Sequence, residues 1–223
     1  MEPGGHGDFA IVSYRPHHRA AVRRICVATA WMGEPAPDRI ADDWIWAEFW
    51  TRYFTDREPR HTWVVEDIRH RQAVGYLMGT ADAAQVERYA AFLVPGILYR
   101  VCRRRLLRRA APRRALLAMA RSLLSGELDV PARVRRRYPG TLHIDLLPQA
   151  RGRGFASRLF RLYIDRMRQL GVPGVHAQSL GANEAIAAFN RRAGFRLIDT
   201  RPIHALAGVD ARPVTISTWV LPL

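Results

Sequence analysis

Short apolar stretches along the chain have the patterns typical of β-strands. Phe9 to Tyr14 alternates between apolar and polar residues and predicts a half-buried strand. Thr62 to Asp67 and Ala73 to Thr80 are apolar runs joined by a charged connection, which predicts a hairpin. Three further strands are expected later in the chain, at Gly174 to Leu180, Phe195 to Asp199 and Pro213 to Leu221.

Other stretches repeat apolar residues at helical spacing. We predict helices over Arg15 to Ala30, over about Asp38 to Asp56, and over Asn183 to Ala193. The second of these contains three Trp between Asp43 and Thr51. Aromatic stripes usually face protein cores, so we expect these rings to pack inward rather than to form the wall of a substrate cleft.

The stretch from Leu142 to Leu170 joins a short apolar run to a Gly-rich turn and then to an amphipathic helix. Gly152 and Gly154 allow the backbone of this turn to approach a ligand closely. The unpaired N–H groups of the first helical turn point toward that ligand. Because such a helix start attracts anions, the sequence predicts an anion-binding site, with phosphate as the expected group.

Length and composition indicate a single domain, residues 1–223. A chain of 223 residues with 48% apolar content is large enough to bury a stable core. The two cysteines, Cys26 and Cys102, belong to no Cys/His ligand pattern, so we expect no structural metal and a reducing compartment. The first residues do not have the features of a signal peptide, and no apolar run is long enough to span a bilayer, so we expect a cytoplasmic protein.

The chain is strongly basic, with a formal net charge of +15, and all 35 basic residues are Arg because the sequence contains no Lys. Most of the charge lies in an insertion at about residues 81–140, where the strand pattern is interrupted. Between Arg100 and Arg137, thirteen arginines stand against Glu127 and Asp129. The rest of the chain is therefore nearly balanced in charge.

The insertion is predicted to be helical. A first helix is expected to end at Pro112, and a second to run from Arg113 to Ser125. The first has an apolar stripe at every fourth place, which we expect to pack on the core: Leu98, Cys102, Leu106 and Ala110.

Three roles are open for the charge of the insertion. It can be the solvated face of packed helices. It can be a docking surface for an acidic partner or for the phosphates of a cofactor. Binding of nucleic acid or of an anionic membrane surface is less favoured, because no aromatic residues interleave with the arginines to stack on bases. The charge alone does not decide among these roles.

Two common phosphate-binding motifs do not fit the Gly-rich turn. A dinucleotide-binding unit has a third Gly where this chain has Ser157, and an acidic residue at the end of the next strand, which is missing here. A Walker-type loop requires a Lys, and the chain has none.

The Gly-rich turn instead closely resembles the signature of the GCN5-related N-acetyltransferase (GNAT) superfamily, which is Gln or Arg, two residues, Gly, one residue, and Gly or Ala. The chain meets it in two overlapping registers, Gln149-x-x-Gly152-x-Gly154 and Arg151-x-x-Gly154-x-Ala156. The segment Asn183 to Phe195 is similar to the second characteristic helix of the superfamily and the strand after it.

This resemblance implies an α/β (α+β) fold, with a mixed central β-sheet flanked by helices and the basic helical insertion placed before the signature strand. It covers Phe9 to Leu221 apart from the insertion. A narrower resemblance, carried by Tyr138 to Pro148, the insertion and Gly174 to His176, is to the acetyltransferase-like domain of O-GlcNAcase and its stand-alone bacterial relatives.

The resemblance also implies acetyl-CoA as the cofactor, with an amine of a small molecule or peptide as the unidentified acceptor. The backbone of Leu146 and Leu147 would pair with the pantetheine arm, and an amide near Leu146 would polarise the thioester carbonyl. Asn183 and Asn190 would lie near the same arm. The pyrophosphate would be held by the segment after the strand, namely Arg151, Gly152, Arg153, Gly154, Phe155, Ala156 and Ser157.

The resemblance leaves open which residues act as the general base and the general acid. Candidates for the general base are His143 and Asp145, which share one face of the signature strand, and His176 on the next strand. Asn190 stands where many relatives have the Tyr that protonates coenzyme A, and an amide cannot deliver a proton at neutral pH. Two functions follow, an active N-acetyltransferase or a catalytically silent acetyl-CoA-binding module whose Arg-rich insertion docks an acidic partner.

Overall fold

The computed structural model describes residues 8–36, 40–206 and 214–223. Three sequence-based expectations fall outside these residues. They are the reading of the extreme N-terminus, the start of the second helix at Asp38, and the loop Ala207 to Arg212 with Pro213 after it.

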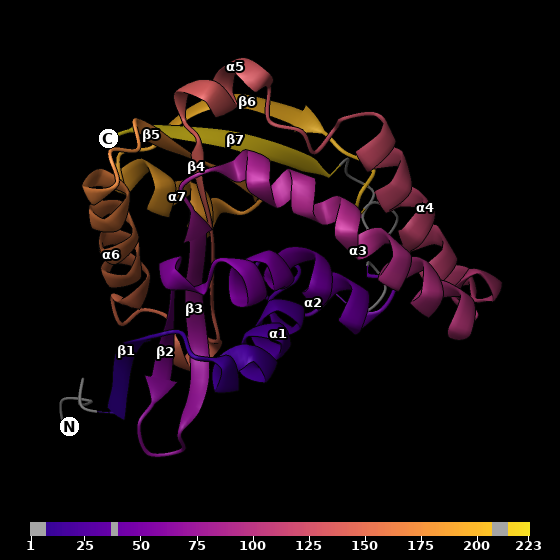
Figure 1. Cartoon of the computed structure of the whole chain (residues 1–223), viewed down its shortest axis with the longest axis horizontal. Coiled ribbons are helices and arrows are strands. Elements are labelled where there is room, and N and C mark those ends of the chain that lie inside the picture. The colour runs from indigo at the N-terminus through magenta and orange to yellow at the C-terminus, as the bar shows by residue number, and fades with distance from the viewer. Residues whose placement is uncertain (1–7, 37–39, 207–213) are drawn as a thin grey trace.

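Seven strands in the described residues form one mixed sheet with the order β1-β2-β3-β4-β5-β7-β6 (Figure 1). Neighbouring strands are antiparallel except for the central pair, β4 and β5, which is parallel. The fold class expected from the sequence is therefore confirmed. The strands are β1 (Phe9–Ser13), β2 (Thr62–Asp67), β3 (Gln72–Thr80), β4 (Gly140–Leu146), β5 (Gly174–Leu180), β6 (Arg196–Pro202) and β7 (Thr215–Pro222).

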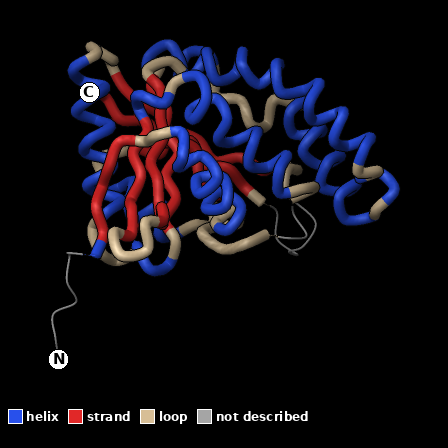
Figure 2. The backbone as a smooth tube through the Cα atoms, turned by 60° about the horizontal axis from the view of Figure 1, so that its bottom comes forward, coloured by secondary structure: helices blue, strands red, loops and turns tan. Residues whose placement is uncertain are grey.

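Helices lie on both faces of this sheet (Figure 2). They are α1 (Arg19–Ala28), α2 (Asp43–Arg52), α3 (Ala83–Arg103), α4 (Ala110–Leu124), α5 (Ala132–Arg137), α6 (Phe155–Gln169) and α7 (Glu184–Arg192).

Because side chains alternate in direction along each strand, the hydrophobic core is divided between the two faces of the sheet. Leu77 on β3 and Val175 on β5 pack against α6, whose buried residues include Leu159 and Tyr163. Tyr76, the neighbour of Leu77, points to the opposite face, which α1 covers through Val22 and Ile25 and the turn after α2 covers through Phe54. The Gly-rich turn and the face of α1 and α2 are thus on opposite sides of the sheet.

The insertion covers the side of β7 that points away from α6. Val134 of α5 packs on Val220, and Met119 of α4 packs on a small cluster that contains Ile203 and Ile216. In Figure 1, α3 and α4 lie on the side of the molecule away from α6. No helix within the described ranges is both long and apolar enough to cross a membrane.

The break in the insertion differs from the sequence-based expectation. The chain leaves the helix between Arg103 and Ala110, and Pro112 lies inside the first turn of α4. A proline is tolerated there because the first N–H groups of a helix have no intrahelical acceptor. Helix α3 also continues through Pro95, which costs it one helical hydrogen bond.

Only part of the apolar stripe expected to pack on the core does so, namely Leu106 just after α3. Leu98 is 57% exposed and Cys102 is exposed, whereas the buried residues of α3 include Leu93 and Val101. The reason is that α3 has apolar residues on nearly all sides between Arg88 and Arg100. Spacing alone could not tell which of two apolar stripes faces the protein.

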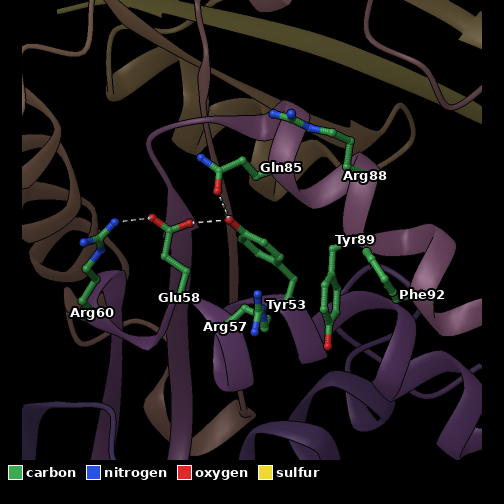
Figure 3. Close-up of a pocket in the computed structure, with 8 residues that line it drawn as sticks. All are labelled: Tyr53, Arg57, Glu58, Arg60, Gln85, Arg88, Tyr89 and Phe92. Atoms are coloured by element: carbon green, nitrogen blue, oxygen red, sulfur yellow. Dashed lines mark hydrogen bonds and ion pairs between the residues drawn. The ribbon is translucent and has the colours of Figure 1, made fainter.

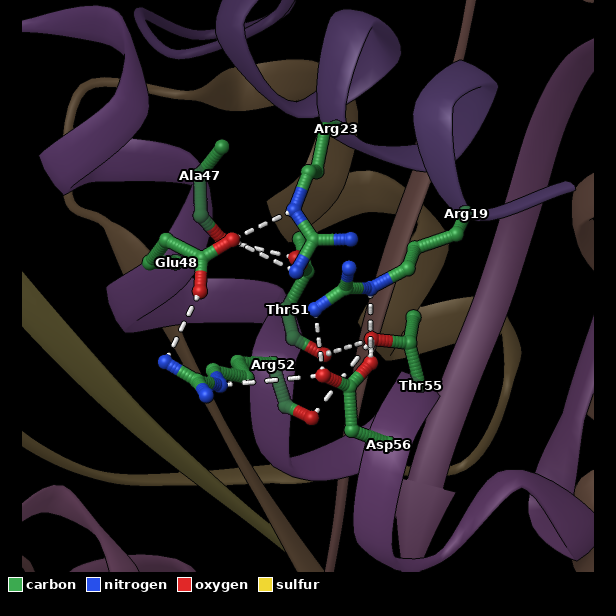
Figure 4. A network of polar contacts seen from close by, with 8 residues as sticks. All are labelled: Arg19, Arg23, Ala47, Glu48, Thr51, Arg52, Thr55 and Asp56. Carbon is green, nitrogen blue, oxygen red and sulfur yellow. Dashed lines mark hydrogen bonds and ion pairs between the residues drawn. The ribbon is translucent and has the colours of Figure 1, made fainter. Parts of the chain in front are cut away.

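Ion pairs lock α2 against α1 (Figure 4). Glu48 of α2 is only 4% exposed, and it accepts a hydrogen bond from Nε of Arg23 on α1 at 2.6 Å. Arg52, one turn further along α2, lies 3.3 Å from the other oxygen of Glu48. Arg19 donates to Asp56 at 2.9 Å and closes the other end of the network. This network fixes the position of the aromatic residues that α2 presents to the sheet.

We expect Glu48→Ala to destabilise the protein by about 3 kcal/mol, because it leaves the largely buried Arg23 guanidinium without its partner. Urea unfolding measures this. The matched control is Asp165→Ala, which breaks an exposed pair with Arg168 and should cost less than about 1 kcal/mol. Equal losses in the two variants would show that the buried network does not hold the helices together.

Candidate active site

The central strands separate after a short contact. β4 and β5 pair only at Gly140 with Val175 and at Thr141 with His176. Leu147, just after β4, donates its N–H to the carbonyl of Val74 at 2.8 Å. Because backbone groups alternate in direction along an antiparallel strand, those of Ile144 and Leu146 point the other way, into the gap beside β5. The gap is therefore lined by strand backbone that pairs with no neighbouring strand.

The Gly-rich turn lies at the end of this gap, where β4 leads into α6. Gly152 and Gly154 have φ of +71° and +76°, in the left-handed region that favours glycine. A Cβ added at either would meet nothing within 4 Å, so open space adjoins the turn. In the described part of the chain, the N–H groups from Gly152 to Ser157 have no backbone acceptor. These amides are therefore free to bind an anion, as the predicted anion site requires.

Two of the residues expected to bind the cofactor through their backbone have amides that are already hydrogen-bonded within the protein. The N–H of Arg151 is bonded to the carbonyl of Pro148 at 3.1 Å, and the N–H of Leu147 is bonded to β3, so neither amide is free for a ligand. The cause is the short 3₁₀ turn Pro148–Ala150, which uses the Arg151 amide to close itself.

The Arg151 side chain is also engaged. Its Nε donates to the carbonyl of Leu146 at 2.9 Å, and its terminal nitrogens contact the carbonyl of Gly33 and, at 3.3 Å, the carboxylate of Glu34. Arg151 thus ties the end of β4 to the segment after α1. Arg153, which stacks over the Phe9 ring at 5.1 Å, remains exposed beside the turn.

Several buried polar atoms without partners belong to elements beside the gap. Among the described residues these include Nε1 of Trp50, Nε2 of Gln178, Nδ2 of Asn190 and Oγ1 of Thr218. Gln178 and Thr218 are cross-strand partners on β5 and β7. These four atoms are therefore available to bond to a ligand in the gap.

Comparison with known proteins agrees with this geometry. No protein-family model matches the chain. The crystal structure of SsHAT shares 30% identity with it over 94% of this chain and 96% of that chain, with a TM-score of 0.66. A Drosophila melanogaster polyamine N-acetyltransferase that forms N-acetylagmatine matches at 18% identity over 97% and 100% of the two chains, with a TM-score of 0.59. A GNAT superfamily phosphinothricin acetyltransferase from Sinorhizobium meliloti, solved with acetyl-CoA, matches at 17% identity over 97% and 89%, with a TM-score of 0.56.

The chain belongs to the GNAT superfamily. Its β4 is the signature strand, and its Gly-rich turn opens the signature helix α6. The second characteristic helix is α7, capped by Asn183, whose side chain accepts the N–H of Ile186 at 3.1 Å as the sequence predicted.

The face of the GNAT sheet opposite α6 carries the titratable residues. His143 and Asp145 point to the same side of β4, and Nε2 of His143 lies 3.5 Å from Oδ2 of Asp145. Tyr76 on β3 is fully buried and donates its hydroxyl to the same Asp145 oxygen at 2.6 Å. Trp50 of α2 places its ring 6.1 Å from that of His143. These four residues form one cluster beside the gap.

Sequence reasoning missed Tyr76 and placed Trp50 differently. Tyr76 reads as an ordinary residue of a hairpin strand, and only the register of β3 with β4 brings it opposite Asp145. The three Trp of α2 are half-buried rather than fully packed inward. Trp50 therefore serves both as packing and as a wall of the site.

Burial sets the protonation of this cluster. Desolvation raises the pKa of the Asp145 carboxyl, although His143, Tyr76 and Arg151 oppose this effect. Burial, together with the Asp145 charge, raises the pKa of Tyr76 well above its usual value, so its hydroxyl stays protonated and acts as a donor. Burial likewise raises the pKa of the nearby Cys26 thiol and keeps it unreactive.

His176 has a different environment from His143. It is buried where β4 and β5 still pair, and its Nδ1 lies 2.6 Å from the carbonyl oxygen of Tyr138. A carbonyl accepts, so Nδ1 carries the proton, and burial lowers the pKa of the imidazole. His143, in contrast, has a side chain that is 35% exposed. His143 is the better placed of the two for proton transfer with a ligand.

Two residues of the signature helices are fixed by packing. Tyr163 of α6 is buried, and its hydroxyl donates to the carbonyls of Thr80 and Thr141, both at 3.0 Å, so it is a core residue. Asn190 of α7 is 5% exposed, and its Nδ2 has no partner within the described structure. Asn190 can therefore donate a hydrogen bond to a ligand but holds no proton to transfer.

A surface cleft lies away from this site (Figure 3). It is lined by Tyr53, Glu58 and Tyr89 among others. Glu58 accepts hydrogen bonds from the hydroxyls of Tyr53 at 2.7 Å and Thr80 at 2.6 Å. Thr80 pairs with Thr141, at the end of β4 remote from the Gly-rich turn. The cleft therefore lies toward the closed end of the gap and not at the Gly-rich turn.

Three polar residues at the edge of the sheet lie close enough together to be considered as metal ligands. His17, His18 and Glu66 offer ligand atoms within 4.8 Å of one another. However, Nδ1 of His18 accepts the N–H of Arg15 at 2.9 Å, so its Nε2 carries the proton, which it donates to Glu66 at 2.6 Å. A metal ion would need the lone pair of that nitrogen, so this arrangement does not suit one.

We expect Asp145→Asn to make the protein more stable at about pH 7. The folded pKa of Asp145 is raised by burial, so its ionised form costs stability as the pH rises through the usual carboxyl range. The gain should disappear below about pH 4, where the carboxyl is protonated in both folded and unfolded chains. Urea unfolding at the two pH values measures it. Asp165→Asn, at an exposed position, should show no such gain, and a gain of equal size there would contradict the argument.

Proposed function

We propose that this protein is an acetyl-CoA-dependent N-acetyltransferase that acetylates an amine of a small molecule or peptide. One observation carries the proposal. The gap between β4 and β5 has free amides from Gly152 to Ser157 at its end and the pair His143 and Asp145 on its opposite side. An anion-binding site and a candidate base thus meet at one opening in the sheet.

The residues around the gap fit acetyl-CoA. The amides from Gly152 to Ser157 and the exposed Arg153 would hold the pyrophosphate. The gap-facing backbone of Ile144 and Leu146 would pair with the pantetheine amides as a strand would, with Arg151 holding the Leu146 carbonyl in place. Acetyl-CoA, when bound, supplies an acetyl thioester. The N–H of Leu146 would donate to the thioester carbonyl.

His143 is proposed to accept the proton that the amine loses when its nitrogen forms the bond to the acetyl carbon. Asp145, held by the Tyr76 hydroxyl, would orient the imidazole and stabilise its charged form. The bond between carbon and sulfur breaks, and the sulfur takes its proton from solvent. Asn190 would donate a hydrogen bond to that sulfur from its unpartnered Nδ2.

The proposed acceptor is an amine, because an amine loses a proton when it is acetylated and the site offers His143 as a base to take that proton. Structural neighbours act on different amines, including agmatine and phosphinothricin. The narrower similarity to the acetyltransferase-like domain of O-GlcNAcase stays a prediction from the sequence. Aromatic Trp50 beside His143 would favour an acceptor that approaches as a cation and loses its proton at the site.

The pyrophosphate site is tested by Gly154→Asp. Asp tolerates the left-handed backbone conformation of this position, but it adds a negative charge beside the free amides. Calorimetric titration should show acetyl-CoA affinity reduced about 30-fold, or about 2 kcal/mol. The control is Gly171→Asp, at the other end of α6, with φ of +68° and equally open space. Equal losses in both variants, or none, would count against the proposed cradle.

Catalysis is tested by following free thiol released from acetyl-CoA across a panel of amines. We expect release that depends on the acceptor, and a loss of about 100-fold in kcat for His143→Gln. His176→Gln should keep most of its kcat, because this histidine is bonded to the backbone. Wild-type kcat retained in His143→Gln would exclude the proposed base.

A second function is favoured by Asn190 alone, namely a silent acetyl-CoA-binding module. It predicts tight binding in calorimetry with no thiol release by the wild type over the whole panel. An Asn190→Tyr variant that then gains release would show that only the proton donor was missing. Acceptor-dependent release by the wild type would exclude this second function.

A further inference from the structure

Helix α3 carries an apolar surface that the rest of the described structure leaves uncovered. The exposed large hydrophobic residues outside the insertion are few and scattered, with only Leu197 and Ile198 of β6 adjacent to each other. In the insertion they gather along α3 and α4, with Phe92 77% exposed, Tyr99 68% and Leu124 90%. The others there are Val94, Leu98, Leu107, Leu117 and Leu123.

The outer face of α3 has a regular composition. Arg88, Phe92, Pro95, Tyr99 and Arg103 follow one another at helical spacing, and all five are exposed. The opposite face, with Leu93 and Val101, is buried. The exposed stripe is thus apolar and aromatic in its middle, with an arginine at each end. Such an arrangement is typical of helices that lie in the interface of a bilayer.

The charge of the surrounding surface has a single sign. From residue 88 to residue 126 the chain contains ten arginines and no acidic residue. Arg100 is paired with Asp42 at 2.6 Å. Among the described residues, Arg103, Arg104, Arg105, Arg108 and the later arginines of this segment form no ion pair. These guanidinium groups are free to bind phosphate.

The same facts argue against a second copy of the chain as the occupant. Two copies meeting through α3 would bring the same unpaired arginines together, in a molecule with a net charge of +15. An acidic protein would match the charge but would also need a groove complementary to a convex helix that exposes Phe92 and Tyr99. A bilayer needs no such register, because hydrocarbon accommodates any apolar side chain.

We propose that the outer face of α3, with the arginines between α3 and α4, docks the protein on a bilayer that contains anionic phospholipid. Phe92, Leu98 and Tyr99 insert at the level of the headgroups, and Arg103 to Arg109 bind the lipid phosphates.

Cys102 gives a direct probe of this contact. It is exposed on α3, one residue from Arg103, while the other cysteine, Cys26, is buried and will not react. A polarity-sensitive fluorophore on Cys102 of the full chain should shift to the blue with vesicles of phosphatidylcholine containing about 30% phosphatidylglycerol. It should not shift with phosphatidylcholine alone. Lipids that carry a quencher in the acyl chain should quench the fluorophore if the helix reaches the hydrocarbon.

Variants separate the apolar contribution from the charge. Unlabelled Phe92→Ser with Tyr99→Ser should bind the anionic vesicles about tenfold more weakly in co-flotation. Its control is Leu197→Ser with Ile198→Ser, which removes two exposed apolar residues from β6.

The charge is tested by changing Arg103, Arg104 and Arg105 together to Gln, which should also weaken binding to the anionic vesicles about tenfold. Their control is the same change at Arg161, Arg168 and Arg192, exposed on α6 and α7.

Several results would overturn the proposal. One is a wild-type protein that stays unbound with anionic vesicles at physiological salt, and another is an equal loss in the control variants. Retained binding in the Phe92 and Tyr99 variant would show that charge alone attracts the protein, as it would attract any polyanion. A dimer in light scattering that becomes a monomer in the same variant would assign the surface to a second copy of the chain.

Discussion

The rest of the structure depends on one constraint, namely that the parallel strands β4 and β5 pair at one end and separate at the other. At the closed end, Gly140 and Gly174 let β4 and β5 approach. A Cβ at Gly140 would lie 2.7 Å from Val175, and one at Gly174 would lie 2.5 Å from the Tyr138 ring. Beyond Thr141 and His176 the strands have no partner on the gap side. A sheet opened in this way must satisfy its backbone elsewhere, so it is prepared to bind a ligand that offers amides.

The gap also separates two kinds of electrostatic environment. On the α6 side, free N–H groups and a helix start favour negative charge. On the other side, Asp145 is half-buried, and loss of contact with water raises the pKa of its carboxyl, which accepts a hydrogen bond from Tyr76. An anion and an amine can therefore reach the same opening from opposite faces without competing for the same groups. This arrangement costs stability, because the carboxylate of Asp145 is partly removed from water. Functional sites often retain such local instability.

The insertion adds a surface to this fold and leaves the sheet itself unchanged. Its inner residues complete small clusters against β7, while α3 turns a second apolar face outward. In a helix that served only to cover the core, this outer face would be polar. The arginines around it keep such a protein in solution through charge repulsion and at the same time select partners that are anionic.

The sequence by itself determined the strands of the sheet, the Gly-rich turn at the start of α6 and the shared face of His143 and Asp145, because these depend on local periodicity and on turn chemistry. It could not place Tyr76 beside Asp145, since that contact depends on the register of β3 with β4, or show that Arg151 and Leu147 have their amides engaged. It also chose the wrong stripe of α3, because residues 89–99 are apolar on every side. Only the tertiary structure decided which stripe faces the protein, since burial depends on what lies opposite a helix and not on its own sequence.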